Sequence, residues 1–281
     1  MHPEPDRPRA FGRTADGVTE YRDLTVARFM GYRPLECDLH VPDGEGPHPV
    51  VFWIHGGAWR EGSRRDRPPA GKTSDLHGRL LARGYAVADV DYRLSSEAVY
   101  PAQLHDIRAA IDWVHSIAPR AGLDGKRFAL FGDSAGAHLA VLTALAATRG
   151  DDPRPAVRAV VDWYGPTDLT FPDGPPAPDD PAIPLFGGLP ADVPDIARLG
   201  SPVYQVHPQA PPLFCVHGSL DRNVPFGASE ALVAAWRAQG VSAELLPAIG
   251  AGHCFEGYPD VDTLIERSVG FLDRTLAARP A

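Results

Sequence analysis

The sequence predicts an α/β protein with a mostly parallel central sheet of about eight strands and helices on both faces. Two observations carry this prediction. Apolar runs of strand length alternate with segments of helical spacing, and several runs are continuously hydrophobic, as expected for strands buried on both faces. Such alternation implies right-handed crossovers and a parallel sheet, whose ligands lie outside the carboxyl ends of the strands.

The first half of the chain opens with low apolar content, and residues 1–18 are expected to form a flexible arm. Two antiparallel strands joined by a turn near Gly31 follow. A loop over residues 60–72, which carries Arg64, Arg65 and Arg67, is expected to be solvated. The elements expected here are strands at 21–29, 35–41, 50–54, 85–90 and 128–131, and helices at 75–83, 102–117 (ended by Pro119) and 135–148.

The second half contains an excursion from the sheet. Eight prolines lie between residues 172 and 194, and strand patterns resume afterwards, so residues 166–206 are expected to form a short lid-like excursion or pocket wall. Residues 19–281 are therefore expected to be a single domain. The remaining expected elements are strands at 157–163, 213–216 and 243–246, and helices at 227–239 and 262–277.

Composition excludes several classes of function. The net charge of −9 favours neither nucleic acid nor an anionic membrane as a partner, and no apolar run approaches the length of a membrane span. Residues 1–13 lack the apolar core of a signal peptide, and three cysteines without metal-ligand spacing indicate reduced thiols in a cytoplasmic protein. No metal or organic cofactor is expected, and the oligomeric state stays open, a homodimer included.

A strand-to-helix turn carries the pattern Gly132-Asp-Ser-Ala-Gly136. A chain that reverses within so few residues strains the central residue, and the flanking glycines have no Cβ to clash with the neighbouring strand and helix. The alternative is a small serine in a glycine-rich turn. The apolar strand before the turn and the Ala/Leu-rich helix after it favour a nucleophile elbow with Ser134 exposed at its tip.

A second glycine motif, His55-Gly-Gly-Ala-Trp59, directly follows the apolar strand at 50–54. It is either a tight turn or a backbone loop that aims N–H groups at a developing oxyanion. Occurring before the elbow, it predicts an oxyanion hole built from the N–H groups of Gly56, Gly57 and Ala135.

Two polar residues after later strands complete a catalytic set. Asp221 follows the strand at 213–216 and His253 follows the strand at 243–246, which gives the order Ser, Asp, His along the chain. A serine hydroxyl is a weak nucleophile until an imidazole removes its proton, and the imidazole needs a carboxylate to fix its tautomer. Ser134, His253 and Asp221 are therefore predicted as nucleophile, general base and orienting acid.

The other candidate residues receive structural roles. His55 is expected to shape the oxyanion loop, His138 to be structural, Asp133 to orient neighbouring loops and Cys254 to be a small packed residue. The aromatic residues near strand ends are expected either to wall a compact substrate pocket or to pack in the core: Trp59, Trp163 and Tyr164.

Taken together, these motifs resemble those of hormone-sensitive-lipase-like and related bacterial carboxylesterases of the α/β-hydrolase superfamily, from about residue 35 to the C-terminus. The fourth position of the oxyanion loop is Ala58 followed by Trp59, a variant similar to kynurenine formamidases and to feruloyl or acetyl-xylan esterases. The resemblance implies a serine hydrolase that cleaves small-molecule carboxylic esters. Small to medium acyl groups are expected, with short ones preferred because the aromatic residues near the strand ends could wall a compact pocket. An arylformamidase or amidase with the same triad and a non-catalytic binding module are the alternatives.

Overall fold

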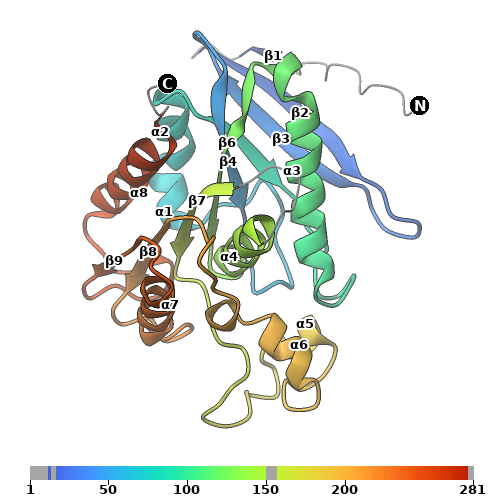
Figure 1. The fold of residues 1–281 in the computed structure, drawn as a ribbon, viewed down its shortest axis with the longest axis vertical. Helices are drawn as coiled ribbons and strands as arrows, with labels where there is room; N and C mark the ends of the chain where they lie inside the picture. The colour runs from blue at the N-terminus through green and yellow to red at the C-terminus, as the bar shows by residue number, and fades with distance from the viewer. Residues whose placement is uncertain (1–11, 14–16, 150–156, 278–281) are drawn as a thin grey trace.

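The central feature of the structure is one twisted sheet. The computed structural model describes residues 12–13, 17–149 and 157–277, in which nine strands lie in the order β1-β2-β3-β5-β4-β6-β7-β8-β9 (Figure 1). Neighbours from β5 to β9 are parallel, whereas β1, β2, β3 and β5 pair antiparallel. The strands are β1 Gly12–Arg13, β2 Val18–Ala27, β3 Leu35–Pro42, β4 His48–Ile54, β5 Ala86–Val90, β6 Leu123–Asp133, β7 Val157–Trp163, β8 Leu213–Gly218 and β9 Ala243–Ala248.

Helices cover both faces of this sheet, as predicted. Helices α3, α4 and α7 pack on one face, and α1, α2 and α8 pack on the other (Figure 1). The described helices are α1 Pro69–Thr73, α2 Leu76–Ala82, α3 Ala102–Ala121, α4 Ala135–Thr148, α5 Ala182–Phe186, α6 Pro194–Leu199, α7 Gly227–Ala238 and α8 Val261–Leu276, with 3₁₀ turns η1 Pro202–Tyr204 and η2 His253–Phe255. The α/β-hydrolase architecture expected from the sequence is confirmed.

The two faces bury separate apolar layers. Every residue of β5 is buried, and the last five of the seven residues of β4 are buried without interruption, which fits strands covered on both sides. Beneath α8, Phe131 lies at the centre of an aromatic group, with ring centroids 5.4 Å from Trp53 and 4.9 Å from Trp163. This tight packing gives the carboxyl edge of the sheet a rigid base.

Helix α3 runs past the position at which the sequence predicted its end. Pro119 was expected to stop the helix, yet the helix continues to Ala121 and closes at Gly122, which has φ of 71° and donates its N–H to the carbonyl of Ala118. Proline lacks a donor and crowds the turn before it, but the residues after it keep helical geometry. The glycine, which adopts the left-handed conformation freely, ends the helix.

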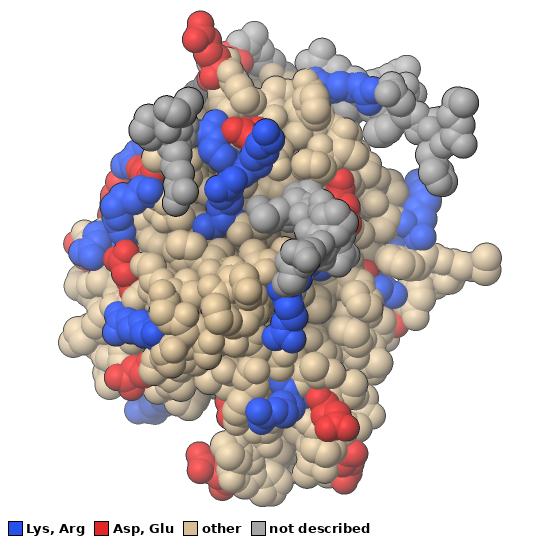
Figure 2. All heavy atoms as spheres, in the orientation of Figure 1, with Lys and Arg blue, Asp and Glu red and all other residues tan. Residues whose placement is uncertain are grey.

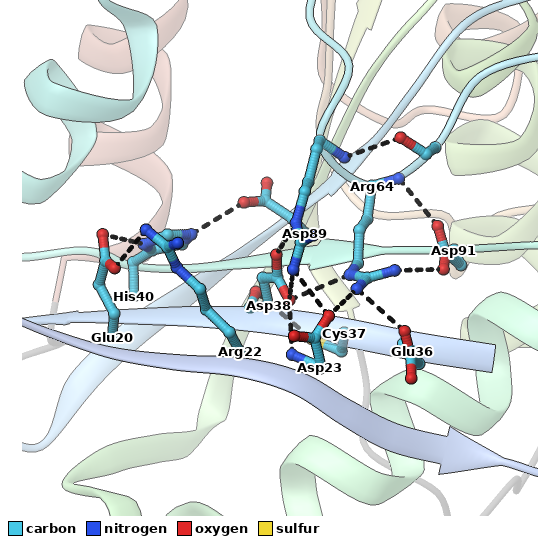
Figure 3. Close-up of polar contacts among 12 residues, drawn as sticks. Glu20, Arg22, Asp23, Glu36, Cys37, Asp38, His40, Arg64, Asp89 and Asp91 are labelled. Atoms are coloured by element: carbon cyan, nitrogen blue, oxygen red, sulfur yellow. Dashed lines mark hydrogen bonds and ion pairs between the residues drawn. The ribbon is translucent and has the colours of Figure 1, made fainter. Parts of the chain in front are cut away.

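The loop after the oxyanion motif is exposed at most of its residues, as predicted, but Arg64 departs from that prediction. Arg64 is buried and contacts four carboxylates (Figure 3). Its guanidinium lies 3.0 Å from Asp38, 2.8 Å from Asp91 and 2.9 Å from Glu36, and it also binds Asp23. We call these five residues the Arg64 cluster.

The Arg64 cluster ties the antiparallel end of the sheet to the loop that follows the oxyanion motif. Burial acts against charge on Arg64, but hydrogen bonds and proximity to Asp38 and Asp91 outweigh it and raise the pKa of the guanidinium. The backbone N–H of Arg64 also donates to Asp91, 2.9 Å away, so both main chain and side chain are held. Removing the cation would leave the two buried carboxylates, Asp38 and Asp91, with only the more exposed Arg65 and Arg33 as partners.

The N-terminal arm and the excursion after β7 are the segments that the sequence placed outside the sheet. Of the predicted N-terminal arm, Gly12–Arg13 pairs with β2 and most other residues lie outside the described part. The excursion after β7 holds α5, α6 and η1, and packs Ala182, Leu185 and Ala197 into the core.

On the face shown in Figure 2, basic and acidic side chains are interspersed rather than gathered by sign. Within the described residues, no helix has both the length and the apolar character needed to span a bilayer.

We expect Arg64→Ala to lower the free energy of unfolding by about 3–5 kcal/mol, because it removes the buried cation that contacts the buried carboxylates of Asp38 and Asp91. Arg65→Ala is the matched control. Arg65 also binds Asp38, but its side chain is 54% exposed, so its loss should cost less than about 1 kcal/mol. Urea denaturation of both variants measures the difference, and equal losses would contradict the buried role of Arg64.

Candidate active site

The turn at Ser134 is a strained elbow at the carboxyl end of β6. Ser134 has φ of 51° and ψ of −120°, and its N–H donates to the carbonyl of Trp163 at 2.8 Å. A Cβ on Gly132 would lie 2.5 Å from the carbonyl carbon of Gly136, and a Cβ on Gly136 would lie 2.1 Å from the oxygen of Ile54. Only glycine fits at both positions, which explains the spacing of the motif.

The structure brings together the three residues predicted as a triad. Nδ1 of His253 lies 2.7 Å from Oδ2 of Asp221, and Nε2 of His253 lies 3.2 Å from Oγ of Ser134. Because a carboxylate only accepts, Nδ1 carries the proton and Nε2 is left to accept from the serine hydroxyl. This is the geometry that a serine nucleophile and its general base require.

Asp221 is held as a carboxylate. Its Oδ1 accepts hydrogen bonds from the N–H groups of Asn223 and Val224, both at 2.9 Å. Burial acts to raise its pKa, but contacts with His217 and His253 and the N–H of Val224 outweigh burial and hold the pKa below its usual range. His217, fully buried, begins the His217-Gly-Ser-Leu-Asp221 segment, to whose histidine the sequence assigned no role; its Nε2 lies 3.3 Å from Oδ2 of Asp221.

His253 lies on a short, tightly bound loop. It begins η2, and the two residues after it, Cys254 and Phe255, have φ of 56° and 59°. The N–H of Gly252 donates to Glu256 at 2.8 Å, which closes the loop. The ring of Tyr164 lies 4.9 Å from the imidazole, centroid to centroid, and packs against it.

The oxyanion loop corrects one predicted donor. The N–H of Gly56 donates to Oδ1 of Asp133 at 2.8 Å, so it is not available to an oxyanion. Within the described part of the chain, the N–H groups of Gly57, Ala58 and Ala135 donate to no protein acceptor. Ala58 therefore replaces Gly56 as a candidate. Because a backbone donor has no side-chain signature, the sequence could not distinguish the two.

His55 shapes this loop, as predicted, and is not placed as a base. Its Nδ1 lies 2.7 Å from the carbonyl of Gly56, and its ring stacks on Tyr92 at 4.3 Å. Burial lowers the pKa of His55. The hydroxyl of Tyr92 donates to the carbonyl of His55 at 2.9 Å.

The three aromatic residues predicted as pocket walls are buried. Trp163 lies in the core under α8 and donates to Ser268 at 3.1 Å, so its pocket role is wrong. In β7, Ala159, Val161 and Trp163 share one face and alternate with Val160 and the charged Asp162, so the pattern already favoured core packing for Trp163. Trp59 donates to Nδ1 of His138 at 3.2 Å, and the side chain of Tyr164 is fully buried behind His253. The core-packing alternative holds for both tryptophans.

His138 links three parts of the site region. Its Nδ1 accepts from Trp59, so Nε2 carries the proton and donates to the carbonyl of Gly200 in the excursion at 2.7 Å. Burial lowers the pKa of His138 to about 4, and the ring stays neutral at ordinary pH. His138 is thus structural, as predicted. No group of three or more potential metal ligands occurs among the described residues.

The fold and the Ser–His–Asp geometry define an α/β-hydrolase. A family model described as BD-FAE matches residues 37–236, and the chain belongs to this family. Esterase LipQ of Mycobacterium tuberculosis is 33% identical over 222 residues, which cover 74% of this chain and 50% of the relative. The chain spans about half the length of the curated relatives it matches.

Solved structures show the same fold. A bacterial heroin esterase is 26% identical with a TM-score of 0.73, over 94% of this chain and 86% of that chain. A truncated carbohydrate esterase from gut microbiota is 24% identical with a TM-score of 0.80, over 95% and 100%.

Asp133 yields a prediction about stability and pH. Burial raises its pKa to about 7, against the opposing effects of the Gly56 N–H, His253 and Arg67. When a carboxyl group has a higher pKa in the folded state than in the unfolded state, the folded protein loses stability as the pH rises from the unfolded-state pKa to the folded-state pKa. Relative to Asp133→Asn, the wild-type protein should therefore become less stable between about pH 4 and pH 7. Melting temperatures across this range test it, and parallel curves would contradict it.

Proposed function

We propose that this protein is a serine carboxylesterase that cleaves esters of small to medium acyl groups through an acyl-enzyme. The observation that carries the proposal is the hydrogen-bonded chain from Ser134 through His253 to Asp221 at a strained elbow. The esterase names of the relatives support ester bonds as the target. They do not favour the arylformamidase alternative.

The proposed reaction has two halves. Oγ of Ser134 attacks the ester carbonyl while Nε2 of His253 takes its proton, and the oxyanion is stabilised by the N–H groups of Gly57, Ala58 and Ala135. Collapse of the intermediate expels the alcohol, which receives the proton from His253. Water then gives a proton to His253 and attacks the acyl group, and Ser134 regains its proton as the acid departs.

Asp221 supports both halves of the reaction. Its Oδ2 accepts the Nδ1 proton of His253, which keeps Nε2 facing Ser134. Its depressed pKa keeps the carboxylate charged next to the imidazolium that forms in each half. The buried N–H contacts at Oδ1 fix its orientation.

Small-molecule esters are the proposed substrates, which the esterase name of the 33% identical relative and that of the heroin esterase support. The three free cysteines support a reducing, cytoplasmic location, as the sequence suggested. A homodimer is the assembly to test by light scattering.

Hydrolysis of p-nitrophenyl esters from acetate to laurate is the direct test. We expect rapid turnover of the short esters, and loss of that turnover in Ser134→Ala. Absence of Ser134-dependent turnover of any ester would reject the esterase proposal, and turnover of aryl formamides alone would favour the alternative.

Asp221→Asn should lower kcat by about 10⁴-fold, because an amide favours the wrong imidazole tautomer. The Asp168→Asn variant is a control of the same chemistry: Asp168 contacts Thr170 and Tyr204 instead of the triad. Steady-state kinetics with p-nitrophenyl acetate should show an unchanged kcat for this control. A similar loss in both variants would contradict the role of Asp221.

A further inference from the structure

Asp133 is a buried carboxylate at the centre of the site with no place in the proposed reaction. It is the last residue of β6, next to Ser134, and only 6% of its surface is exposed. Its Oδ1 accepts the N–H of Gly56, which lies in the loop after β4, 77 residues earlier in the chain. The carboxylate thus joins the elbow directly to the oxyanion loop.

The contact fixes one end of a peptide whose other end is also held. The N–H of the His55–Gly56 peptide is bound by Asp133, and its carbonyl accepts from the hydroxyl of Tyr92 at 2.9 Å. The carbonyl of the next peptide, Gly56–Gly57, is held by Nδ1 of His55 at 2.7 Å. Because the C=O and N–H of a trans peptide point in opposite directions, the N–H of Gly57 points away from His55.

The backbone beyond these anchors is strained. Gly57, Ala58 and Trp59 have φ of 110°, 51° and 58°, a run that L-residues adopt only when the surroundings impose it. Such conformations are unfavourable for each non-glycine residue, here Ala58 and Trp59. A loop of this kind relaxes when an anchor is lost.

We propose that Asp133 is a positioning residue for the oxyanion hole, and that it acts by accepting the N–H of Gly56 and so fixing the strained backbone of Gly57 and Ala58. This inference rests on the proposed esterase function. Acceptance of a hydrogen bond, rather than negative charge, is the property required, so an asparagine can replace the aspartate whereas an alanine cannot.

The competing role for Asp133 is electrostatic. Its carboxylate lies close enough to His253 for their charges to interact, so a negative charge here could stabilise the imidazolium. The two roles separate cleanly. Loss of charge alone removes the electrostatic effect and leaves the hydrogen bond in place.

The experiment compares Asp133→Ala, Asp133→Asn and Tyr92→Phe by kcat and KM for p-nitrophenyl acetate. A displacement of the loop by 1 Å can cost about 100-fold in rate, so we expect Asp133→Ala to lose about 100-fold in kcat with KM changed less than about threefold. Asp133→Asn should retain kcat within about fivefold. Tyr92→Phe, which removes the hydrogen bond to the carbonyl of the His55–Gly56 peptide, should lower kcat about tenfold.

Ser268→Ala is the matched control. Ser268 is a fully buried residue of α8 whose hydroxyl accepts from the indole N–H of Trp163. Its loss also leaves a buried donor unpaired, without touching the oxyanion loop. Its kcat should equal that of the wild type, which separates general destabilisation from displacement of the oxyanion loop.

Three results would overturn the inference: a wild-type kcat in Asp133→Ala, a loss in Asp133→Asn as large as in Asp133→Ala, or a loss confined to KM. If Asp133→Ala does not fold, the other two variants decide. A 100-fold fall in Asp133→Asn or an unchanged Tyr92→Phe then rejects it. Failure of the esterase proposal is distinct, because the wild type would then show no Ser134-dependent turnover.

Discussion

The strained backbone at Ser134 is the constraint on which the rest of the site depends. A φ of 51° with ψ of −120° persists only where the surroundings impose it. Here they do so at close range: the N–H of Ser134 is bound by Trp163 and the turn is pressed against the carbonyl of Ile54. The turn can be this tight because Gly136 faces the end of β4 and Gly132 faces the start of α4. The rigid sheet thereby fixes the position of the Ser134 hydroxyl.

Much of this arrangement could be predicted from the sequence, because local patterns dictate it. Helix α4 and strand β7 begin and end at the predicted residues, and the order Ser, Asp, His along the chain correctly selected the three residues that meet. Buried parallel strands are recognised by continuous apolar runs, and amphipathic helices by apolar residues that recur every three or four positions. The carboxyl ends of such strands share one edge, so residues that follow them meet there.

The errors have a different origin, since each depends on a partner distant in the chain. Arg64 is buried only because carboxylates from three strands or their flanking loops surround it, and a run of arginines in sequence does not reveal them. Gly56 is lost as an oxyanion donor to the side chain of Asp133. The indole N–H of Trp163 donates to Ser268, 105 residues later in the chain, which holds this side chain in the core. Side-chain partners across the fold decided these cases.

The contact between Ser134 and His253 joins positions 119 residues apart, and His253 follows a strand that has a neighbour on one side only. A catalytic set spread in this way exists only while β6, β8 and β9 are all docked. Partial opening at an edge costs less free energy than unfolding the whole sheet. The triad therefore comes apart when β9 detaches from β8, even while the central strands of the sheet stay paired.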